Sequence, residues 1–111
     1  MNKLPKIYII GNTDDTSSLA TKLKINKVEK RLIQKGFDVI NPLKIYEKKT
    51  ISITEATLHN IKKLISCKAV YVMPEVSLKK GDNLELKISI DINLIILQGL
   101  PINIEYNRKS L

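Results

Sequence analysis

The segment Lys6-Ile-Tyr-Ile-Ile-Gly11 is the part of this sequence that best indicates its fold. Its apolar run, residues 7–10, ends at a glycine, which is typical of a short strand buried on both faces of a sheet. Runs of the same kind recur at 37–40, 69–73 and 94–97, and a proline, glycine or asparagine follows each within two positions. We therefore predict four strands.

Helical patterns fill the three intervals between these runs. Residues 17–35 predict a helix that ends at Gly36. The side chains expected on its inner face are Leu19, Leu23, Val28 and Leu32. A second helix is predicted over 54–66, with Leu58, Ile61 and Ile65 on its inner face. A third is predicted to begin at Gly81 and to run to about Ile92, with Asn93 as a left-handed cap.

The remaining segments complete the predicted architecture. Residues 43–50 are polar and irregular, which predicts a loop, and Ile102-Asn103-Ile104 predicts a short edge strand. Strands that alternate with helices form parallel β-α-β units with right-handed crossovers. The predicted fold is an α/β three-layer sandwich around a small parallel sheet of four to five strands. It forms a single domain over residues 1–111, with its core at about 6–104.

Composition limits the partners of this chain. It has 111 residues and a formal net charge of +8, but only two of its 19 basic residues are arginine and its lysines are scattered. Nucleic-acid surfaces usually combine basic residues with stacking aromatics or a recognisable module. The chain has one Phe and four Tyr, so nucleic acid is a disfavoured partner. The positive charge favours a small anionic ligand instead.

The same composition argues against several other classes of protein. The apolar runs are too short to span a bilayer, and no secretory signal is recognisable, so we expect a cytoplasmic protein without a membrane partner. The single cysteine, Cys67, excludes an internal disulfide and a multi-cysteine zinc site, and we expect it to be buried and structural. One histidine, His59, and no clustered carboxylates predict neither a metal site nor a cofactor.

A ligand site is expected where the strands end. In an open parallel sheet, ligands bind beyond the carboxyl ends of the strands, and here those ends are rich in polar and turn residues. The positions concerned are Gly11, Asn12, Asp14 and Asp15, then Asn41 and Pro42, then Pro74, Glu75, Gly81 and Asp82. The loop at Gly11 lacks the Gly-Lys-Ser/Thr ending of a phosphate-binding loop. We therefore favour Gly11 as a turn residue over Gly11 as a phosphate cradle.

Glu85 is the most informative single residue. It falls in the first turn of the third predicted helix, on the same face as Ile88 and Ile92, with Asp82 and Ser89 beside it. The helix N-terminus is expected to favour the ionised carboxylate even when this group is partly buried. Two interpretations stay open: a nucleophile at the mouth of a cleft, or an acid that only stabilises the helix start. Spacing alone favours the second.

Two other side chains have local interpretations. Tyr8 alternates with Ile7 and Ile9 near the end of the first strand, so it either belongs to the core or presents its hydroxyl to the cleft, and the pattern supports both equally. His59 lies close to Lys62 and Lys63, which predicts a position on a helix surface.

Four blocks of sequence, in their order and spacing, resemble nucleoside 2-deoxyribosyltransferase-like proteins. They are Lys6-Ile-Tyr-Ile-Ile-Gly11, Arg31-Leu-Ile-Gln-Lys-Gly36-Phe-Asp-Val-Ile-Asn-Pro42, Ile65-Ser-Cys-Lys-Ala-Val-Tyr-Val-Met-Pro74 and Gly81-Asp-Asn-Leu-Glu85. The resemblance is strongest to the short branch known as domain of unknown function 4406, and it covers roughly residues 6–97.

The resemblance implies a flavodoxin-like fold and chemistry at an N-glycosidic bond. Enzymes of this family cleave the bond in 2′-deoxynucleosides and pass the sugar to another base or to water. Glu85 occupies the position of their nucleophile, Tyr8 matches a tyrosine close to it, and Gly11 begins the loop over the ligand. A carboxylate nucleophile suits an oxocarbenium-like transition state and gives net retention. The family also implies a homo-oligomer, in which a neighbouring subunit completes the site.

Two departures from the family concern the leaving group. Lys79 stands where the transferases carry an acid six positions before the nucleophile, and Asn60 stands where they carry an aspartate in the helix before the third strand. Both acids help to hold or protonate the departing base, and base departure needs a proton. Asp82, Asp14 and Asp15 are the candidates to replace them.

Three functions follow from these observations. The first is a deoxyribosyltransferase-like protein that binds a nucleoside or nucleotide and acts through Glu85 as an N-glycosidase or transferase. The second is a non-catalytic module that binds or sequesters nucleotides, which the replacements at Lys79 and Asn60 favour. The third is a basic protein that contacts nucleic acid.

Overall fold

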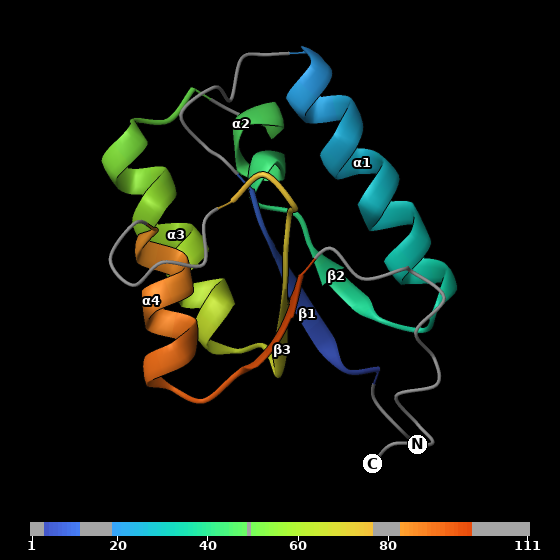
Figure 1. Ribbon diagram of the computed structural model, residues 1–111. Coiled ribbons are helices and arrows are strands. Elements are labelled where there is room, and N and C mark those ends of the chain that lie inside the picture. The colour runs from blue at the N-terminus through green and yellow to red at the C-terminus, as the bar shows by residue number, and fades with distance from the viewer. Residues whose placement is uncertain (1–3, 12–18, 49, 77–82, 99–111) are drawn as a thin grey trace, which may run out of the picture.

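A computed structural model of the chain describes residues 4–11, 19–48, 50–76 and 83–98. These residues form one parallel sheet of four strands in the order β2-β1-β3-β4 (Figure 1). The strands are β1 (Lys6–Ile10), β2 (Asp38–Ile40), β3 (Ala69–Val72) and β4 (Ile95–Gln98). The predicted α/β fold with a small parallel sheet is confirmed. The predicted edge strand at 102–104 lies outside the described residues.

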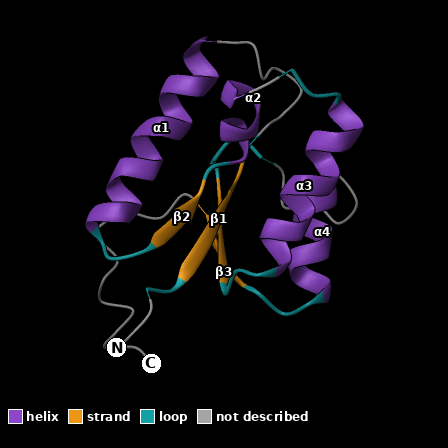
Figure 2. Ribbon diagram, turned by 180° about the vertical axis from the view of Figure 1, so that it is seen from behind, coloured by secondary structure: helices purple, strands orange, loops and turns teal. Residues whose placement is uncertain are grey.

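The helices cover both faces of this sheet. α1 (Leu19–Gln34) lies on one side, and α3 (Ile53–Ile65) and α4 (Leu84–Asp91) lie together on the other (Figures 1 and 2). A short 3-10 turn η2 (Pro42–Lys44) and the helix α2 (Ile45–Lys48) follow β2 at the end of the sheet where the strands finish. The result is the predicted three-layer sandwich.

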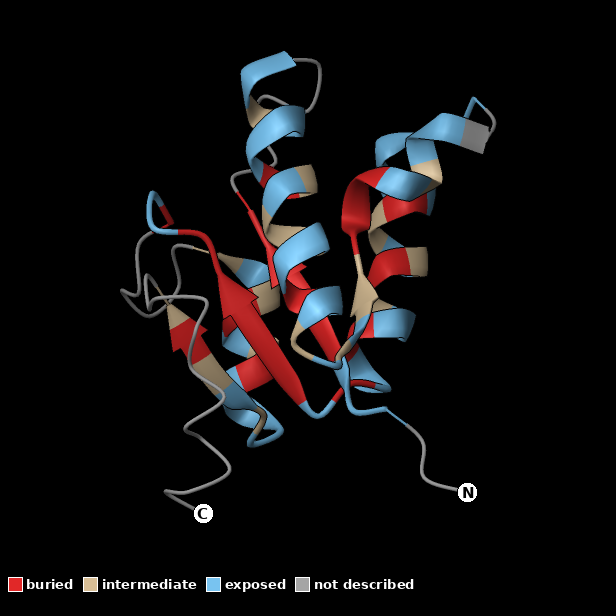
Figure 3. Cartoon of the chain, turned by 90° about the vertical axis from the view of Figure 1, so that its right-hand side faces the viewer, coloured by how far each residue is buried: buried red, intermediate tan, exposed pale blue. Residues whose placement is uncertain are grey.

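The core surrounds the central strand. Every residue of Ile7–Ile10 is completely buried, as expected for a strand that is paired on both edges and covered on both faces (Figure 3). Helices contribute Ile25 and Leu32 from one side and Leu64 and Leu86 from the other. This arrangement fixes the first residues after β1, β2 and β3 at one edge of the sheet.

The inner face predicted for the first helix is correct for Val28 and Leu32 and wrong for Leu19 and Leu23. Leu19 and Leu23 are 69% and 59% exposed, whereas Ile25 and Leu32 are buried with Val28 packed partly against the core. The helix carries two apolar stripes on opposite sides, and periodicity does not say which of them meets the sheet. The stripe richer in β-branched residues packs inward.

The same correction applies to the second predicted helix. Leu58 and Ile65 are 58% and 56% exposed, and the buried positions of α3 are Ala56, Asn60 and Leu64. A polar side chain therefore occupies the centre of the inner face. The predicted stripe exists, but its two end residues lie in solvent.

The predicted loop at 43–50 is also wrong, because η2 and α2 occupy most of it. Asn41 caps η2 by accepting a hydrogen bond from the backbone N–H of Leu43, and Pro42 supplies a preset φ angle at the first position. The third predicted helix, α4, begins at Leu84 rather than at Gly81. Asn93 adopts the predicted left-handed conformation, with a φ angle of 63°.

Candidate active site

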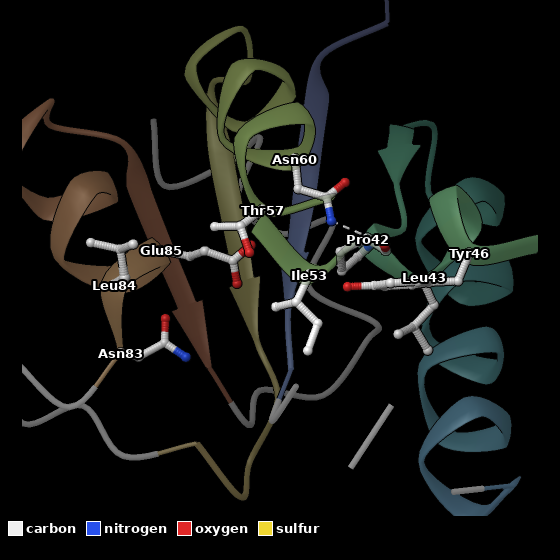
Figure 4. Close-up of a pocket in the computed structure, with 9 residues that line it drawn as sticks. All are labelled: Pro42, Leu43, Tyr46, Ile53, Thr57, Asn60, Asn83, Leu84 and Glu85. Carbon is white, nitrogen blue, oxygen red and sulfur yellow. Dashed lines mark hydrogen bonds between the residues drawn. The ribbon is translucent and has the colours of Figure 1, made fainter. Parts of the chain in front are cut away.

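A cavity of about 270 Å³ lies beside the turn that follows the carboxyl end of β2. Its walls come from η2 and α2, from the first two turns of α3, and from the start of α4 (Figure 4). The lining residues are Pro42, Leu43, Tyr46, Ile53, Thr57, Asn60, Asn83, Leu84 and Glu85. The site therefore lies at the edge of the sheet where a parallel fold is expected to bind ligands.

Glu85 is held in this cavity by its own helix and by the central strand. Asn83 caps α4, since its side-chain oxygen accepts a hydrogen bond of 2.9 Å from the N–H of Leu86. This cap places Glu85 in the first helical turn. The hydroxyl of Tyr8 donates a hydrogen bond to Glu85 Oε2 from the buried middle of β1. Tyr8 therefore belongs to the core, which is the first of its two interpretations, and its hydroxyl contacts Glu85 without lining the cavity itself.

The environment of this pair determines its proton affinity. Burial raises the pKa of the Glu85 carboxyl above its ordinary value, and the hydrogen bond from Tyr8 opposes part of that rise. The net direction is opposite to the one expected from the helix N-terminus. Burial, followed by the charge of Glu85, raises the pKa of the Tyr8 hydroxyl far above its ordinary value. Tyr8 therefore remains a hydrogen-bond donor throughout the physiological pH range.

Pro42 and Asn60 also lie in the cavity wall. The Asn60 side chain is 8% exposed and its Nδ2 donates to the backbone oxygen of Pro42 at 3.1 Å. This bond joins α3 to the turn after β2, so Asn60 has a structural role in addition to its place at the site. Asn60 stands one helical turn beyond Thr57, and both side chains line the same cavity.

Asn41 is not brought to this cavity. Its Nδ2 donates to Asn26 Oδ1 and Glu29 Oε1 of α1, both at 3.1 Å, and its Oδ1 accepts from the N–H of Leu43. It lines a second, smaller hollow of about 120 Å³. The other side chains there include Glu29, Lys44, His59 and Lys63.

Gly11 and Pro74 lie at the same edge of the sheet but do not line the cavity. A Cβ atom at Gly11 would lie 2.9 Å from Cδ1 of Ile25, so the glycine allows the buried side chain of α1 to approach the end of β1. Pro74 is exposed after β3. The other predicted positions lie outside the described residues: Asn12, Asp14, Asp15, Lys79, Gly81 and Asp82.

The cavity also contains residues that the sequence analysis did not select. They are Leu43, Tyr46, Ile53, Thr57, Asn83 and Leu84. In Figure 4, the Tyr46 hydroxyl points into the cavity from the α2 side, facing the wall that carries Glu85. Tyr46 could have been selected from its position. It follows β2 by a few residues, in a segment that was predicted to be a loop at the edge of the sheet where ligands bind.

Cys67 and His59 agree with their predicted places. Cys67 is 5% exposed, donates its thiol hydrogen to the backbone oxygen of Lys63, and has a pKa raised by burial, all of which suit a structural residue. His59 is half-buried on α3. Among the described residues, no three histidine, cysteine or acidic side chains are grouped to hold a metal. No helix in the described part is long and apolar enough to cross a membrane.

Comparison with known proteins agrees with the fold. No family model and no curated protein matches the sequence. Among solved structures, the chain is similar to a 2-deoxyribosyltransferase from the psychrotolerant bacterium Bacillus psychrosaccharolyticus, with a TM-score of 0.65. The two chains are 15% identical, and the match covers 89% of this chain and 77% of the other. At this identity the likeness shows the fold, and the chain therefore shares the fold of a 2-deoxyribosyltransferase.

Proposed function

We propose that this protein binds a nucleoside or nucleotide in the cavity and acts on its N-glycosidic bond through Glu85. The observation that carries the proposal is the Glu85 carboxylate, which lines the cavity and receives a hydrogen bond from a completely buried tyrosine hydroxyl. A carboxylate that only stabilised a helix start would need neither the cavity nor the tyrosine. The fold shared with a 2-deoxyribosyltransferase supports the same reaction class.

The proposed reaction has two displacements at the same carbon. A carboxylate oxygen of Glu85 attacks C1′ of the sugar while the C1′–N bond breaks, and the base leaves with the bonding electrons and takes up a proton from solvent. An acceptor base or water then attacks C1′ and releases Glu85. Tyr8 orients the carboxylate through Oε2, and two inversions give net retention.

The other lining residues suit a small, mostly neutral ligand. A volume of about 270 Å³ is close to the lower end of the roughly 300–1,000 Å³ range of ligand pockets. Hydroxyls of Tyr46 and Thr57 and the side-chain amide of Asn83 are the hydrogen-bonding groups that we assign to the base and sugar. Leu43, Ile53 and Leu84 provide the apolar surface.

The decisive experiment compares the native chain with Glu85→Gln on a panel of deoxynucleosides and deoxynucleotides. Base release is expected from the native chain and is expected to fall by more than about 100-fold in the variant, because glutamine cannot act as the nucleophile. Glu55→Gln is the matched control, since Glu55 is exposed in the first turn of α3 and glutamine preserves its capping role. Absence of base release, or equal rates in the two variants, rejects the enzymatic proposal.

The pH profile tests the assigned role of Tyr8. The nucleophile must be ionised, so activity is expected to fall at low pH along a limb that reflects the raised pKa of Glu85. Tyr8→Phe removes the hydrogen bond that lowers this pKa, so the limb is expected to move to higher pH. An unmoved limb, with activity retained, contradicts the assignment of Tyr8 as the residue that orients Glu85.

A specific observation favours a second candidate, a non-catalytic binding module. Among the described residues, Glu85 is the only acid that lines the cavity, and Asn60 donates to Pro42 where the family carries an acid. A ligand that binds only the folded chain stabilises it by RT ln(1 + L/Kd), where L is the free ligand concentration, so the melting temperature rises with ligand concentration and with affinity. Stabilisation by nucleosides or nucleotides that persists in Glu85→Gln, with no base release from the native chain, supports this alternative.

We also propose that the chain belongs to the short branch known as domain of unknown function 4406. A separate proposal is that the chain self-associates through the side formed by α3 and α4. Ile53 and Leu84 line the cavity and are exposed, and Leu58 lies exposed on the outer surface of α3. A second copy that covered these side chains would bury apolar surface and close the cavity. Leu58→Gln is expected to weaken self-association in sedimentation, and the equally exposed Leu23→Gln on α1 is expected to leave it unchanged.

A further inference from the structure

The outer surface of α1 carries a stripe of side chains that its own core does not use. Leu19, Leu23, Lys30 and Ile33 repeat at steps of four, seven and three residues. Asn26, at the step between Leu23 and Lys30, accepts a hydrogen bond from Asn41 and does not belong to the stripe. Alternating steps of four and three are the spacing of a helix-pairing seam. Leu19, Leu23 and Ile33 are 69%, 59% and 54% exposed. The seam is therefore available to a partner.

The same surface is strongly basic. The exposed cations of α1 are Lys22, Lys24, Lys27, Lys30 and Arg31. Its single acid, Glu29, is turned inward: its side chain is 17% exposed, accepts a hydrogen bond from Asn41 and lies 3.9 Å from Lys44 Nζ. No acid of α1 offsets these cations on the outer side. Lys22 and Lys27 stand on the two flanks of the seam, where charges select a partner helix.

We propose that the outer surface of α1 docks an amphipathic helix of another protein, with apolar residues at a heptad spacing and Glu or Asp on its flanks. Charge complementarity selects this occupant. A second copy of α1 would oppose lysine to lysine along the whole seam, which costs free energy. The inference is independent of the proposed function, because no residue of α1 lines the cavity.

Other anionic partners fit this surface less well. A nucleic acid would use the lysines but gain nothing from three exposed aliphatic side chains, and the described part of α1 has no aromatic residue for base stacking. An anionic membrane needs a broad apolar face, whereas this seam is narrow and interrupted by Lys30. The inner face of α1 is already committed to the sheet through Ile25 and Leu32.

The test uses a synthetic four-heptad helical peptide with leucine at the a and d positions and glutamate at e and g. Titrated into the full chain, it is expected to bind, and to bind more weakly as salt is added, because surface charges are screened. A peptide with lysine at e and g is expected to bind at least about tenfold more weakly. Leu23→Gln is expected to weaken binding of the glutamate peptide by about tenfold.

Two further variants make the result decisive. Leu58→Gln alters an equally exposed leucine on α3 and is expected to leave peptide affinity unchanged. Lys27→Glu is expected to weaken binding of the glutamate peptide and to strengthen binding of the lysine peptide, and a loss of folding would not produce the gain. The proposal is overturned if the glutamate peptide does not bind, if Leu23→Gln binds it as well as the native chain, or if duplex DNA or phosphatidylserine vesicles compete fully with it.

Discussion

The two helical layers of this protein have different tasks. On one side of the sheet, α1 buries only apolar side chains, Ile25 and Leu32, and presents cations to solvent. On the other side, α3 and α4 each bury a polar residue, Asn60 and Ser89, and Glu85 lines the cavity. The α1 layer contributes only apolar packing to the core. The layer of α3 and α4 replaces part of that packing with polar side chains, and these side chains lie at or beside the candidate site.

The largest effects are expected where the two layers behave alike, in their apolar cores. Leu32→Ala in α1 and Leu64→Ala in α3 each remove a buried side chain and are expected to lower the free energy of unfolding by about 3 kcal/mol. Leu23→Ala and Leu58→Ala alter exposed leucines in the same helices and are expected to change it by less than about 0.5 kcal/mol. Denaturant unfolding at low protein concentration measures all four. A large loss from Leu23→Ala would reverse the assigned orientation of α1.

The next-largest effect is expected only in the layer formed by α3 and α4, which buries polar side chains. Asn60→Ala is expected to destabilise the fold by about 2 kcal/mol, because it leaves the backbone oxygen of Pro42 without its hydrogen bond. Thr57→Ala is the control: it alters the same cavity wall, and its hydroxyl makes no hydrogen bond within the described residues. Equal unfolding free energies for the two variants would mean that Asn60 is not structural.

The strands and their ends could be predicted because their signals are local. A run such as Ile7–Ile10 specifies a buried strand by composition and length alone, and a parallel sheet then places the strand ends together. Position alone placed Glu85 in the first turn of a helix at that edge and favoured a structural role, and the family resemblance made it the candidate nucleophile. The structure adds its contact with Tyr8, a residue 77 positions away.

The orientation of the helices could not be predicted, because it depends on non-local packing. For α1 the sequence analysis combined residues from two apolar stripes, of which Leu23 is exposed and Leu32 is buried, and for α3 it selected a stripe whose Leu58 is exposed. The turn η2 and the four-residue helix α2 were missed because they are too short for hydrophobic periodicity to show, and η2 begins at the Asn41 cap. Tyr46 was missed with α2. The direction of the Glu85 pKa was wrong because burial, which a sequence does not display, outweighs the other contributions.

A smaller effect measures how much the buried carboxylate of Glu85 lowers the stability of the folded chain. The pKa of Glu85 is raised in the folded state, so its protonated form is the one that folding favours, and this stabilisation is lost as pH rises through the raised value. At neutral pH, Glu85→Gln is therefore expected to be more stable than the native chain and to melt at a higher temperature. The difference is expected to shrink below about pH 4, where the carboxyl is protonated in both states.

Glutamine can still accept the hydrogen bond from Tyr8, so this comparison isolates the charge. Calorimetry of both chains across pH measures it. A variant that is less stable than the native chain at neutral pH would contradict the raised pKa, and a difference that does not depend on pH would assign the effect to packing.

The smallest effect is expected at Ser89, the other buried polar residue of the layer formed by α3 and α4. Its hydroxyl donates to the backbone oxygen of Glu85 at 2.7 Å, but that oxygen is also the regular helical acceptor for the N–H of Ser89. Ser89→Ala therefore leaves no buried group unpaired, and alanine has the higher helix propensity by about 0.5 kcal/mol. The unfolding free energy is expected to change by less than about 0.5 kcal/mol in either direction. A loss as large as that of Asn60→Ala would show that the second hydrogen bond to the Glu85 carbonyl helps to hold the site, and would place Ser89 beside Tyr8 and Asn83 as a residue that positions Glu85.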